Sequence, residues 1–244
     1  MGDLDGLEYG RLKHTLSGPQ SSAVANWGYQ MMGRFKRAYL RFRYRNSPFP
    51  GSAEYWERRY ATGGTSGDGS YGELAEFKAK VINDFVANRG IERVVELGSG
   101  DGNQLSLLEI PTYLGLDISE TAVEICRKQF SEDEGKSFRH YSPSDYEGES
   151  LAELALSLDI IFHLVEDEIF HTYMTHLFQM ASDWVIIYSS DSEEPFGDGT
   201  VHCRNRKFTN WTEENVNGWE FVEKIDNIYP DQSVADFYIY KKRV

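Results

Sequence analysis

Glu96 and three alternating glycines are the residues of this chain whose types and spacing most clearly indicate chemistry. Gly98, Gly100 and Gly102 follow the apolar run at 94–97, which has the β-branched character of a buried parallel strand. Glycine lets the backbone turn sharply and approach a ligand closely. A carboxylate at the end of such a strand can accept hydrogen bonds from a cationic amino acid group. The pattern therefore predicts a cofactor-binding turn.

The register of the glycines separates two kinds of nucleotide site. A dinucleotide fingerprint counted from Gly98 requires a third glycine where the sequence has Asn103. The third glycine falls at Gly102 instead, and the resulting Glu-x-Gly-x-Gly-x-Gly resembles the class I S-adenosylmethionine (SAM) dependent methyltransferases. A phosphate-binding P-loop is excluded because no Gly-x-x-x-x-Gly-Lys-Ser/Thr occurs. A plain strand-to-helix turn is the alternative interpretation.

Further cofactor ligands follow from this resemblance. Asp117 ends a second apolar run about twenty residues after the first acid, where the carboxylate that binds the ribose hydroxyls is expected. Ile118 is expected to pack on the adenine, Asp145 to accept from its amino group and Tyr146 to cover the ring. A turn aspartate that bonds its own backbone is the alternative for Asp145. The expected cofactor ligands are Glu96, Gly98, Ser99, Gly100, Gly102, Asp117, Ile118, Asp145, Tyr146 and Phe162.

His163 is the first candidate catalytic residue. The run at 158–164 resembles the family's fourth strand and the loop at its carboxyl end, where ligands bind in open α/β sheets. An imidazole can accept a proton near neutral pH, so His163 is either a general base or a residue that shapes the pocket. Glu166 is a candidate substrate contact, although acids at the start of a helix also stabilise its dipole.

The insert at 191–218 supplies the second group of candidates. His202, Arg204 and Arg206 alternate, so an extended segment would present them on one face as a cationic stripe for a carboxylate, phosphate or sugar. His202 is a second candidate base. Trp211 is expected either to stack on a sugar ring or to anchor the insert. A solvated edge strand is the alternative.

The glycine- and serine-rich loop at 63–72 cannot form core. Its aromatic neighbours Tyr60 and Tyr71 indicate a flap that folds over a bound ligand, and Tyr71 is a candidate substrate contact. The segment resembles the lid of a bacterial methyltransferase group associated with polysaccharide and glycolipid assembly. A simple linker is the alternative.

A basic amphipathic helix is predicted at 31–45. Arg34, Arg37, Arg41 and Arg45 fall on one helical stripe, opposite an apolar stripe. Such a helix can dock on the acidic surface of the same protein, lie peripherally on an anionic membrane, or grip an anionic substrate.

The order of the elements predicts an α/β fold of the Rossmann-like class I methyltransferase type. Its sheet is expected to have seven strands, mostly parallel, closed by a C-terminal antiparallel hairpin at 219–228 and 235–240. We divide the chain into a polar arm with the basic helical extension at 1–50, the flap with the first core helix at 51–90, and the SAM-binding core at 91–244.

No metal is predicted. Metal-dependent O-methyltransferases need clustered acids at the ends of the fourth and fifth strands, and the expected strand places Asp159 at its other end. Cys126 and Cys203 have no CxxC spacing, so neither a disulfide framework nor a structural zinc is expected.

Composition limits the function. The formal charge of -14 over 244 residues argues against a nucleic-acid partner. No apolar run approaches the length that spans a bilayer and no signal peptide is visible, so a cytoplasmic enzyme is expected. The resemblance implies methyl transfer from SAM to a small molecule or a glycan or glycolipid precursor, preferably to oxygen. A non-catalytic SAM-binding or nucleotide-binding module is the alternative, and the oligomeric state is open.

Overall fold

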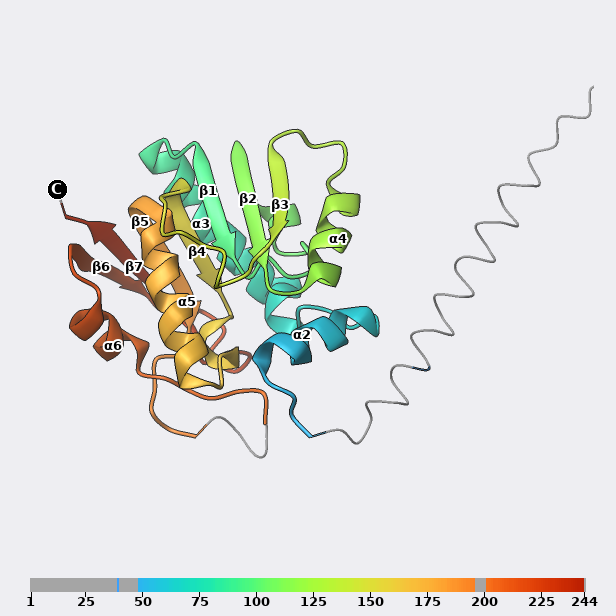
Figure 1. The fold of residues 1–244 in the computed structure, drawn as a ribbon. Helices are drawn as coiled ribbons and strands as arrows, with labels where there is room; N and C mark the ends of the chain where they lie inside the picture. The colour runs from blue at the N-terminus through green and yellow to red at the C-terminus, as the bar shows by residue number, and fades with distance from the viewer. Residues whose placement is uncertain (1–38, 40–47, 196–200, 244) are drawn as a thin grey trace, which may run out of the picture.

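A seven-stranded sheet with helices on both faces forms the centre of the molecule (Figure 1). The structure is a computed structural model that describes residue 39, residues 48–195 and residues 201–243. The strand order is β3-β2-β1-β4-β5-β7-β6, in which β7 is antiparallel to both of its neighbours and the other pairs are parallel. The predicted fold class is confirmed, including the seven strands and the closing hairpin.

The elements have the following bounds. The strands are β1 Arg93–Leu97, β2 Thr112–Asp117, β3 Lys136–His140, β4 Ala152–Leu158, β5 Ala181–Ser189, β6 Trp219–Ile225 and β7 Asp236–Lys242. The helices are α2 Ser52–Ala61, α3 Gly72–Arg89, α4 Glu120–Gln129, α5 Asp167–Met180 and α6 Phe208–Asn215. Three short 3-10 helices are η1 Asp68–Ser70, η2 Leu105–Leu107 and η3 Ile161–His163.

Two apolar cores lie on the two faces of the sheet. Alternate residues of a strand point to opposite faces, so Val94 of β1 packs with α3 and α4 while Val95 packs with α5 and α6. Both side chains are buried, as expected for a central parallel strand. The sheet is therefore held rigidly from both sides, and the ends of its strands can position side chains accurately.

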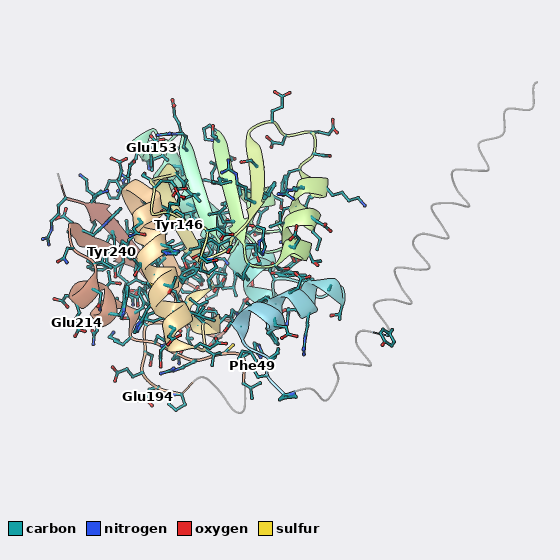
Figure 2. All side chains as sticks on the ribbon, viewed as in Figure 1. Phe49, Tyr146, Glu153, Glu194, Glu214 and Tyr240 are labelled. Atoms are coloured by element: carbon teal, nitrogen blue, oxygen red, sulfur yellow. The ribbon has the colours of Figure 1, made fainter. Side chains whose placement is uncertain are left out.

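Helix α2 and the loop after it lie across the carboxyl ends of the parallel strands, at the lower edge of the molecule in Figure 1. Glu57 of α2 joins this layer to the start of α4, because its carboxylate accepts hydrogen bonds from the hydroxyls of Ser119 at 2.6 Å and Thr121 at 2.5 Å. In Figure 2, Phe49 and Glu194 lie at this lower edge and Glu153 at the opposite one. Segments from distant parts of the chain thus meet where the parallel strands end.

The fourth strand lies earlier in the chain than the sequence predicted. It covers 152–158, and the expected strand at 158–164 is a turn followed by η3. Asp159 therefore follows the strand directly at its carboxyl end, and the prediction that it lies at the other end was wrong. Residue 159 has a φ of 59°, which ends the strand and which aspartate tolerates better than most residues.

The insert also differs from the predicted extended segment. Residues 203–207 have no regular structure, and α6 begins at Phe208, so Trp211 lies on a helix. Apart from Tyr39, the basic segment at 31–45 lies outside the described residues. Within the part of the chain that the structure describes, we find no helix with the length and apolar character needed to cross a bilayer.

Candidate functional site

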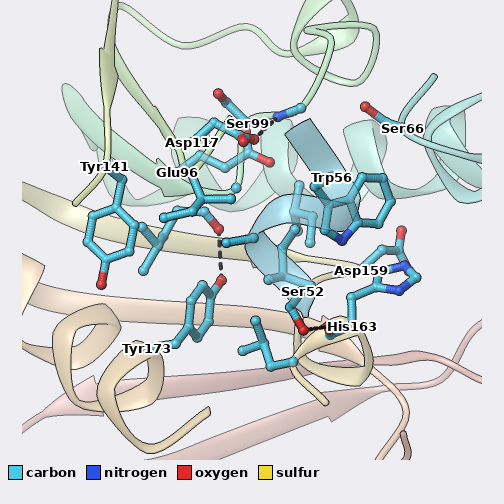
Figure 3. A pocket seen from close by; sticks show the side chains of 18 of the residues that line it. Ser52, Trp56, Ser66, Glu96, Ser99, Asp117, Tyr141, Asp159, His163 and Tyr173 are labelled. Atoms are coloured by element: carbon cyan, nitrogen blue, oxygen red, sulfur yellow. Dashed lines mark hydrogen bonds between the residues drawn. The ribbon is translucent and has the colours of Figure 1, made fainter. Parts of the chain in front are cut away.

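A cavity of about 480 Å³ opens at the carboxyl ends of β1, β2 and β4, beneath α2. Figure 3 shows Glu96, Ser99 and Asp117 together in it, with Trp56 and His163 on one side and Tyr141 and Tyr173 on the other. Ligands of open α/β sheets bind at this edge. The cavity brings together most, but not all, of the predicted site residues.

Glu96 occupies the floor of the cavity and is only 3% exposed. Its carboxylate accepts a hydrogen bond of 2.5 Å from the Tyr113 hydroxyl. Burial raises the pKa of Glu96 to about 7, because the charged form loses its hydration. A cationic group bound in the cavity would stabilise the charged form of Glu96 and lower its pKa again.

Asp117 ends β2 and faces the same space. One of its oxygens accepts from the backbone N–H of Gly100 and the other from the backbone N–H of Ser119, each at 2.8 Å. Burial raises the pKa of Asp117 to about 6 despite these two donors. The acid therefore holds the glycine turn in place while its carboxylate borders the cavity.

Two buried oxygens in the cavity wall have no hydrogen-bond partner among the residues that the structure describes. They are Oγ of Ser99 and Oε1 of Gln104, in side chains that are 7% and 5% exposed. The amide nitrogen of Gln104 donates to the Ala75 carbonyl, which fixes the direction of the free oxygen. Unpaired buried polar atoms are costly, so their position at the cavity indicates a polar ligand.

The glycine turn needs glycine for two separate reasons. Gly98 has a φ of 101°, and a Cβ there would lie 2.4 Å from Cδ1 of Ile160. Gly100 has a φ of 59°, and a Cβ there would lie 2.3 Å from the Ser66 hydroxyl of the flap. The first glycine lets β1 approach the loop after β4, and the second lets the loop at 63–71 lie against the turn.

Lys78 and Asp159 form an ion pair that the sequence analysis missed. Nζ of Lys78 lies 2.5 Å from Oδ2 of Asp159, and the Lys78 side chain is fully buried. Asp159 lines the cavity beside Glu96. The signal was present in the sequence, because Lys78 stands between Leu74 and Ile82 on the apolar face of α3, where a lysine is out of place.

The loop at 63–71 is fastened to the glycine turn through Asp101. The Asp101 carboxylate accepts from the Ser66 N–H at 2.9 Å and from the Tyr71 hydroxyl at 2.7 Å, while its own N–H donates to the Ser66 hydroxyl at 2.9 Å. Asn103 adds a hydrogen bond to the Ser70 carbonyl. Tyr71, a predicted substrate contact, is engaged in this fastening and is not among the residues that line the cavity.

His163 lies at the end of the cavity nearest α2. Its ring meets the edge of Trp56 at a centroid distance of 4.8 Å, and its Nδ1 lies 3.3 Å from Sγ of Cys203. Burial lowers the pKa of His163 to about 4, so the imidazole is neutral at physiological pH. Of the two predicted roles, this environment favours shaping the pocket over accepting a proton.

The remaining substrate candidates form hydrogen bonds with other groups of the protein. The carboxylate of Glu166 accepts from the backbone N–H and the hydroxyl of Ser52, at the start of α2. Arg204 and Arg206 both donate to the Asp167 carboxylate, and Arg206 also donates to the carbonyls of residues 164 and 165. The two arginines therefore hold the insert against the loop before α5.

His202 and Trp211 point to different neighbours. The His202 ring stacks on Tyr55 at a centroid distance of 4.5 Å, close to His163. Trp211 stacks on His171 at 5.8 Å and so anchors α6 on α5. The predicted stripe is thus divided, because Arg204 and Arg206 bind Asp167 whereas His202 stacks on Tyr55.

Four predicted cofactor ligands do not line the cavity: Gly102, Asp145, Tyr146 and Phe162. Asp145 is exposed, and the half-buried Tyr146 donates to the Glu149 carbonyl in the segment between β3 and β4. Tyr141 and Pro143 line the cavity from that segment instead, together with the predicted Ile118.

The fold is that of the Rossmann-like methyltransferases. The N-methyltransferase NodS from Bradyrhizobium japonicum, solved with S-adenosyl-L-homocysteine, aligns at a TM-score of 0.59 with 12% identity, over 79% of this chain and 98% of that one. The 1,6-didemethyltoxoflavin-N1-methyltransferase of Burkholderia thailandensis aligns at 0.59 with 18% identity, over 82% and 93%.

A third solved structure, the methyltransferase domain of bacterial CtHen1-C, aligns at a TM-score of 0.56 with 19% identity, over 70% of this chain and all of that one. No protein-family model matches the sequence. A sequence search of curated proteins finds no match either. The likeness therefore lies in the fold.

Proposed function

We propose that this protein binds SAM in the cavity beneath α2 and transfers its methyl group to a small-molecule acceptor. The observation that carries the proposal is the set of buried polar groups around the cavity: two acids with raised pKa values, Glu96 and Asp117, and two unpartnered oxygens, on Ser99 and Gln104. The structures of NodS and of the toxoflavin methyltransferase with bound S-adenosylhomocysteine support the choice of cofactor.

The residues present fit a molecule with a cationic amino acid end and a ribose. Glu96 and Oε1 of Gln104 would receive the ammonium group, with the carboxylate of Asp159 in the same wall of the cavity. Asp117 would accept from the ribose hydroxyls, and Ile118 and Tyr141 would pack against the base. Bound SAM would supply a methyl group on a sulfonium, which is already a strong electrophile.

The task of the protein is then to orient the acceptor and exclude water. Trp56 and His163 form the wall at which the acceptor would meet the methyl group. The contacts of Asp101 with Ser66 and Tyr71 would keep the flap over the cofactor. We keep oxygen as the preferred methyl acceptor, on a small molecule or on a glycan or glycolipid precursor.

The proposal is tested in two stages. Calorimetric titration with SAM should show one bound cofactor per chain. Methyl-labelled SAM is then incubated with sugars, sugar nucleotides, lipid-linked glycans and amines, and both labelled product and demethylated cofactor are measured. Glu96→Gln serves as the matched inactive variant.

Labelled product from one acceptor class, absent with the Glu96→Gln protein, is the expected result. Tight SAM binding without turnover on any class would identify a non-catalytic binding module. Failure to bind SAM would overturn the proposal as a whole.

A further inference from the structure

Two imidazoles and a thiol converge at the acceptor end of the cavity. His163, His202 and Cys203 each offer one ligand atom, and these atoms all lie within 4.8 Å of one another. His163 ends η3, while the other two residues lie about forty positions later, before α6. The backbone N–H of Arg204 donates to the Phe162 carbonyl at 2.7 Å, and this bond holds the two segments side by side.

A simple thiol–imidazole hydrogen bond does not account for the cluster. Such a bond explains the 3.3 Å between Sγ of Cys203 and Nδ1 of His163. It does not explain the second imidazole, whose ring lies 5.8 Å from that of His163 at an interplanar angle of 10°. Tyr55 stacks on His202 and fixes its ring in this place. The three groups therefore form a set, held by packing from both segments.

The chemistry of the set selects a transition metal. Imidazole nitrogen and thiolate sulfur are ligands of Zn²⁺, at about 2.0–2.1 Å and 2.3 Å respectively, whereas Mg²⁺ and Ca²⁺ require oxygen. Two such ligands on a tetrahedral ion lie roughly 3.5 Å apart, close to the separation of the Cys203 and His163 atoms. Three protein ligands leave one position open, as in catalytic zinc sites.

The set would bring one negative charge to a bound cation. The Cys203 thiolate would be the anionic ligand, beside two imidazole nitrogens. Binding would release the thiol proton to solvent as the metal–sulfur bond forms. Clustered acids are the usual sequence signal for a methyltransferase metal, and this set lacks them, which is why the sequence predicted none.

We propose that His163, His202 and Cys203 bind a divalent transition metal, with Zn²⁺ as the best fit, and that its open position faces the acceptor. The second half of this proposal rests on the proposed function, because His163 also lines the cavity. A metal there would bind an acceptor hydroxyl and lower its pKa, which would assist methyl transfer to oxygen without a protein base.

The test uses the full chain after removal of metal with a chelator. We expect titration with Zn²⁺ in a calorimeter to show one ion per chain, and titration with Co²⁺ to give a cobalt–thiolate charge-transfer band. Cys203→Ser should abolish that band, and both Cys203→Ser and His202→Ala should weaken Zn²⁺ binding about tenfold or more. Cys126→Ser and His171→Ala are the matched controls, because both residues lie outside the set.

Circular dichroism and SAM titration on every variant confirm that the fold is intact. Absence of stoichiometric binding to the wild-type protein, or equal affinities for wild type, Cys203→Ser and His202→Ala, would overturn the metal site. Since Zn²⁺ is titrated without SAM, a protein that binds Zn²⁺ but not SAM keeps the metal site and loses the proposed function. A protein that binds SAM but not Zn²⁺ gives the reverse result.

Discussion

The Asp117 carboxylate has two roles. It accepts the backbone N–H groups of Gly100 and Ser119, and it borders the cavity where a ribose would lie. The first role explains why an acid at the end of β2 is needed even without a ligand. The second predicts that its charge contributes directly to cofactor affinity.

Asp117→Asn should therefore weaken SAM binding. The asparagine keeps the size of the side chain but replaces one accepting oxygen by a donor. Hydrogen bonds to charged groups contribute about 1.5–3 kcal/mol, so the dissociation constant should rise about ten- to hundredfold. Titration calorimetry measures the change, and Asp84→Asn on the surface of α3 is the control. An Asp117→Asn protein with wild-type affinity would contradict a contribution of the Asp117 carboxylate to cofactor binding.

The contacts of the loop at 63–71 test its proposed role as a flap. The Tyr71 hydroxyl donates to the Asp101 carboxylate and fastens the loop at 63–71 to the glycine turn. Tyr71→Phe removes this hydrogen bond and leaves the ring in place, so the flap should open more often. We expect SAM to dissociate about tenfold faster, as measured by stopped-flow displacement.

Tyr146→Phe is the matched control for Tyr71→Phe. Its hydroxyl also donates a single hydrogen bond, to the Glu149 carbonyl, but away from the cavity. If both variants release SAM at the wild-type rate, the loop at 63–71 is a linker and not a lid.

The insert gives a second prediction, about stability. Arg206 is 9% exposed and donates to the carbonyls of Leu164 and Val165. Val165 also accepts from Arg204, so the Leu164 carbonyl is the one that would lose its side-chain donors without Arg206. Arg206→Met should lower the free energy of unfolding by about 2 kcal/mol in urea denaturation. Arg204→Met, at a side chain that is half exposed, should cost less than about 1 kcal/mol. Equal losses for the two variants would contradict the structural role assigned to Arg206.

Most elements could be predicted from local pattern, and the exceptions have physical reasons. The run Val94, Val95 and Leu97 is β-branched or apolar and is indeed a strand. The segment at 152–158 contains alanine, leucine and glutamate, which favour helices, yet it is β4 because the sheet buries it on both faces. Tertiary packing outweighed local propensity there, and the β-branched residues just after it were mistaken for the strand.

The site residues also divide into those that local pattern predicts and those that depend on tertiary packing. Acids at the ends of strands, such as Glu96 and Asp117, can be predicted because parallel strands end at one edge of the sheet. Gln104 cannot be placed without the packing that turns it to the cavity. The position of Lys78 on the apolar face of α3 is visible in the sequence, but its partner Asp159 is not. The convergence of His163 with Cys203 depends on two segments that no local pattern relates.

For the molecule as a whole, the ionised acids of the cavity oppose folding but favour binding of a cationic cofactor. Glu96, Asp117 and Asp159 lie around one space beneath α2, and burial holds the pKa of each of the first two above its usual value. Ionisation of Glu96 and Asp117 opposes folding of the free protein, whereas a cationic cofactor favours their ionised forms. The stability of the free protein and its affinity for SAM should therefore respond to pH in opposite directions.

Glu96→Gln isolates this effect. The pKa of Glu96 rises from 4.5 to about 7 on folding, so the folded state binds its proton more tightly and the contribution of Glu96 to stability falls as pH rises through that window. Relative to Glu96→Gln, the wild-type protein should lose on the order of 3 kcal/mol of unfolding free energy between about pH 4.5 and pH 7.5. Urea denaturation at several pH values measures the difference. Glu124→Gln, on the exposed side of α4, should show no such trend.

Saturating SAM at about pH 7.5 should stabilise the wild-type protein more than Glu96→Gln, because only the wild type offers the cation a carboxylate. A pH-independent difference between wild type and Glu96→Gln would contradict the burial of an ionisable acid at the floor of the cavity.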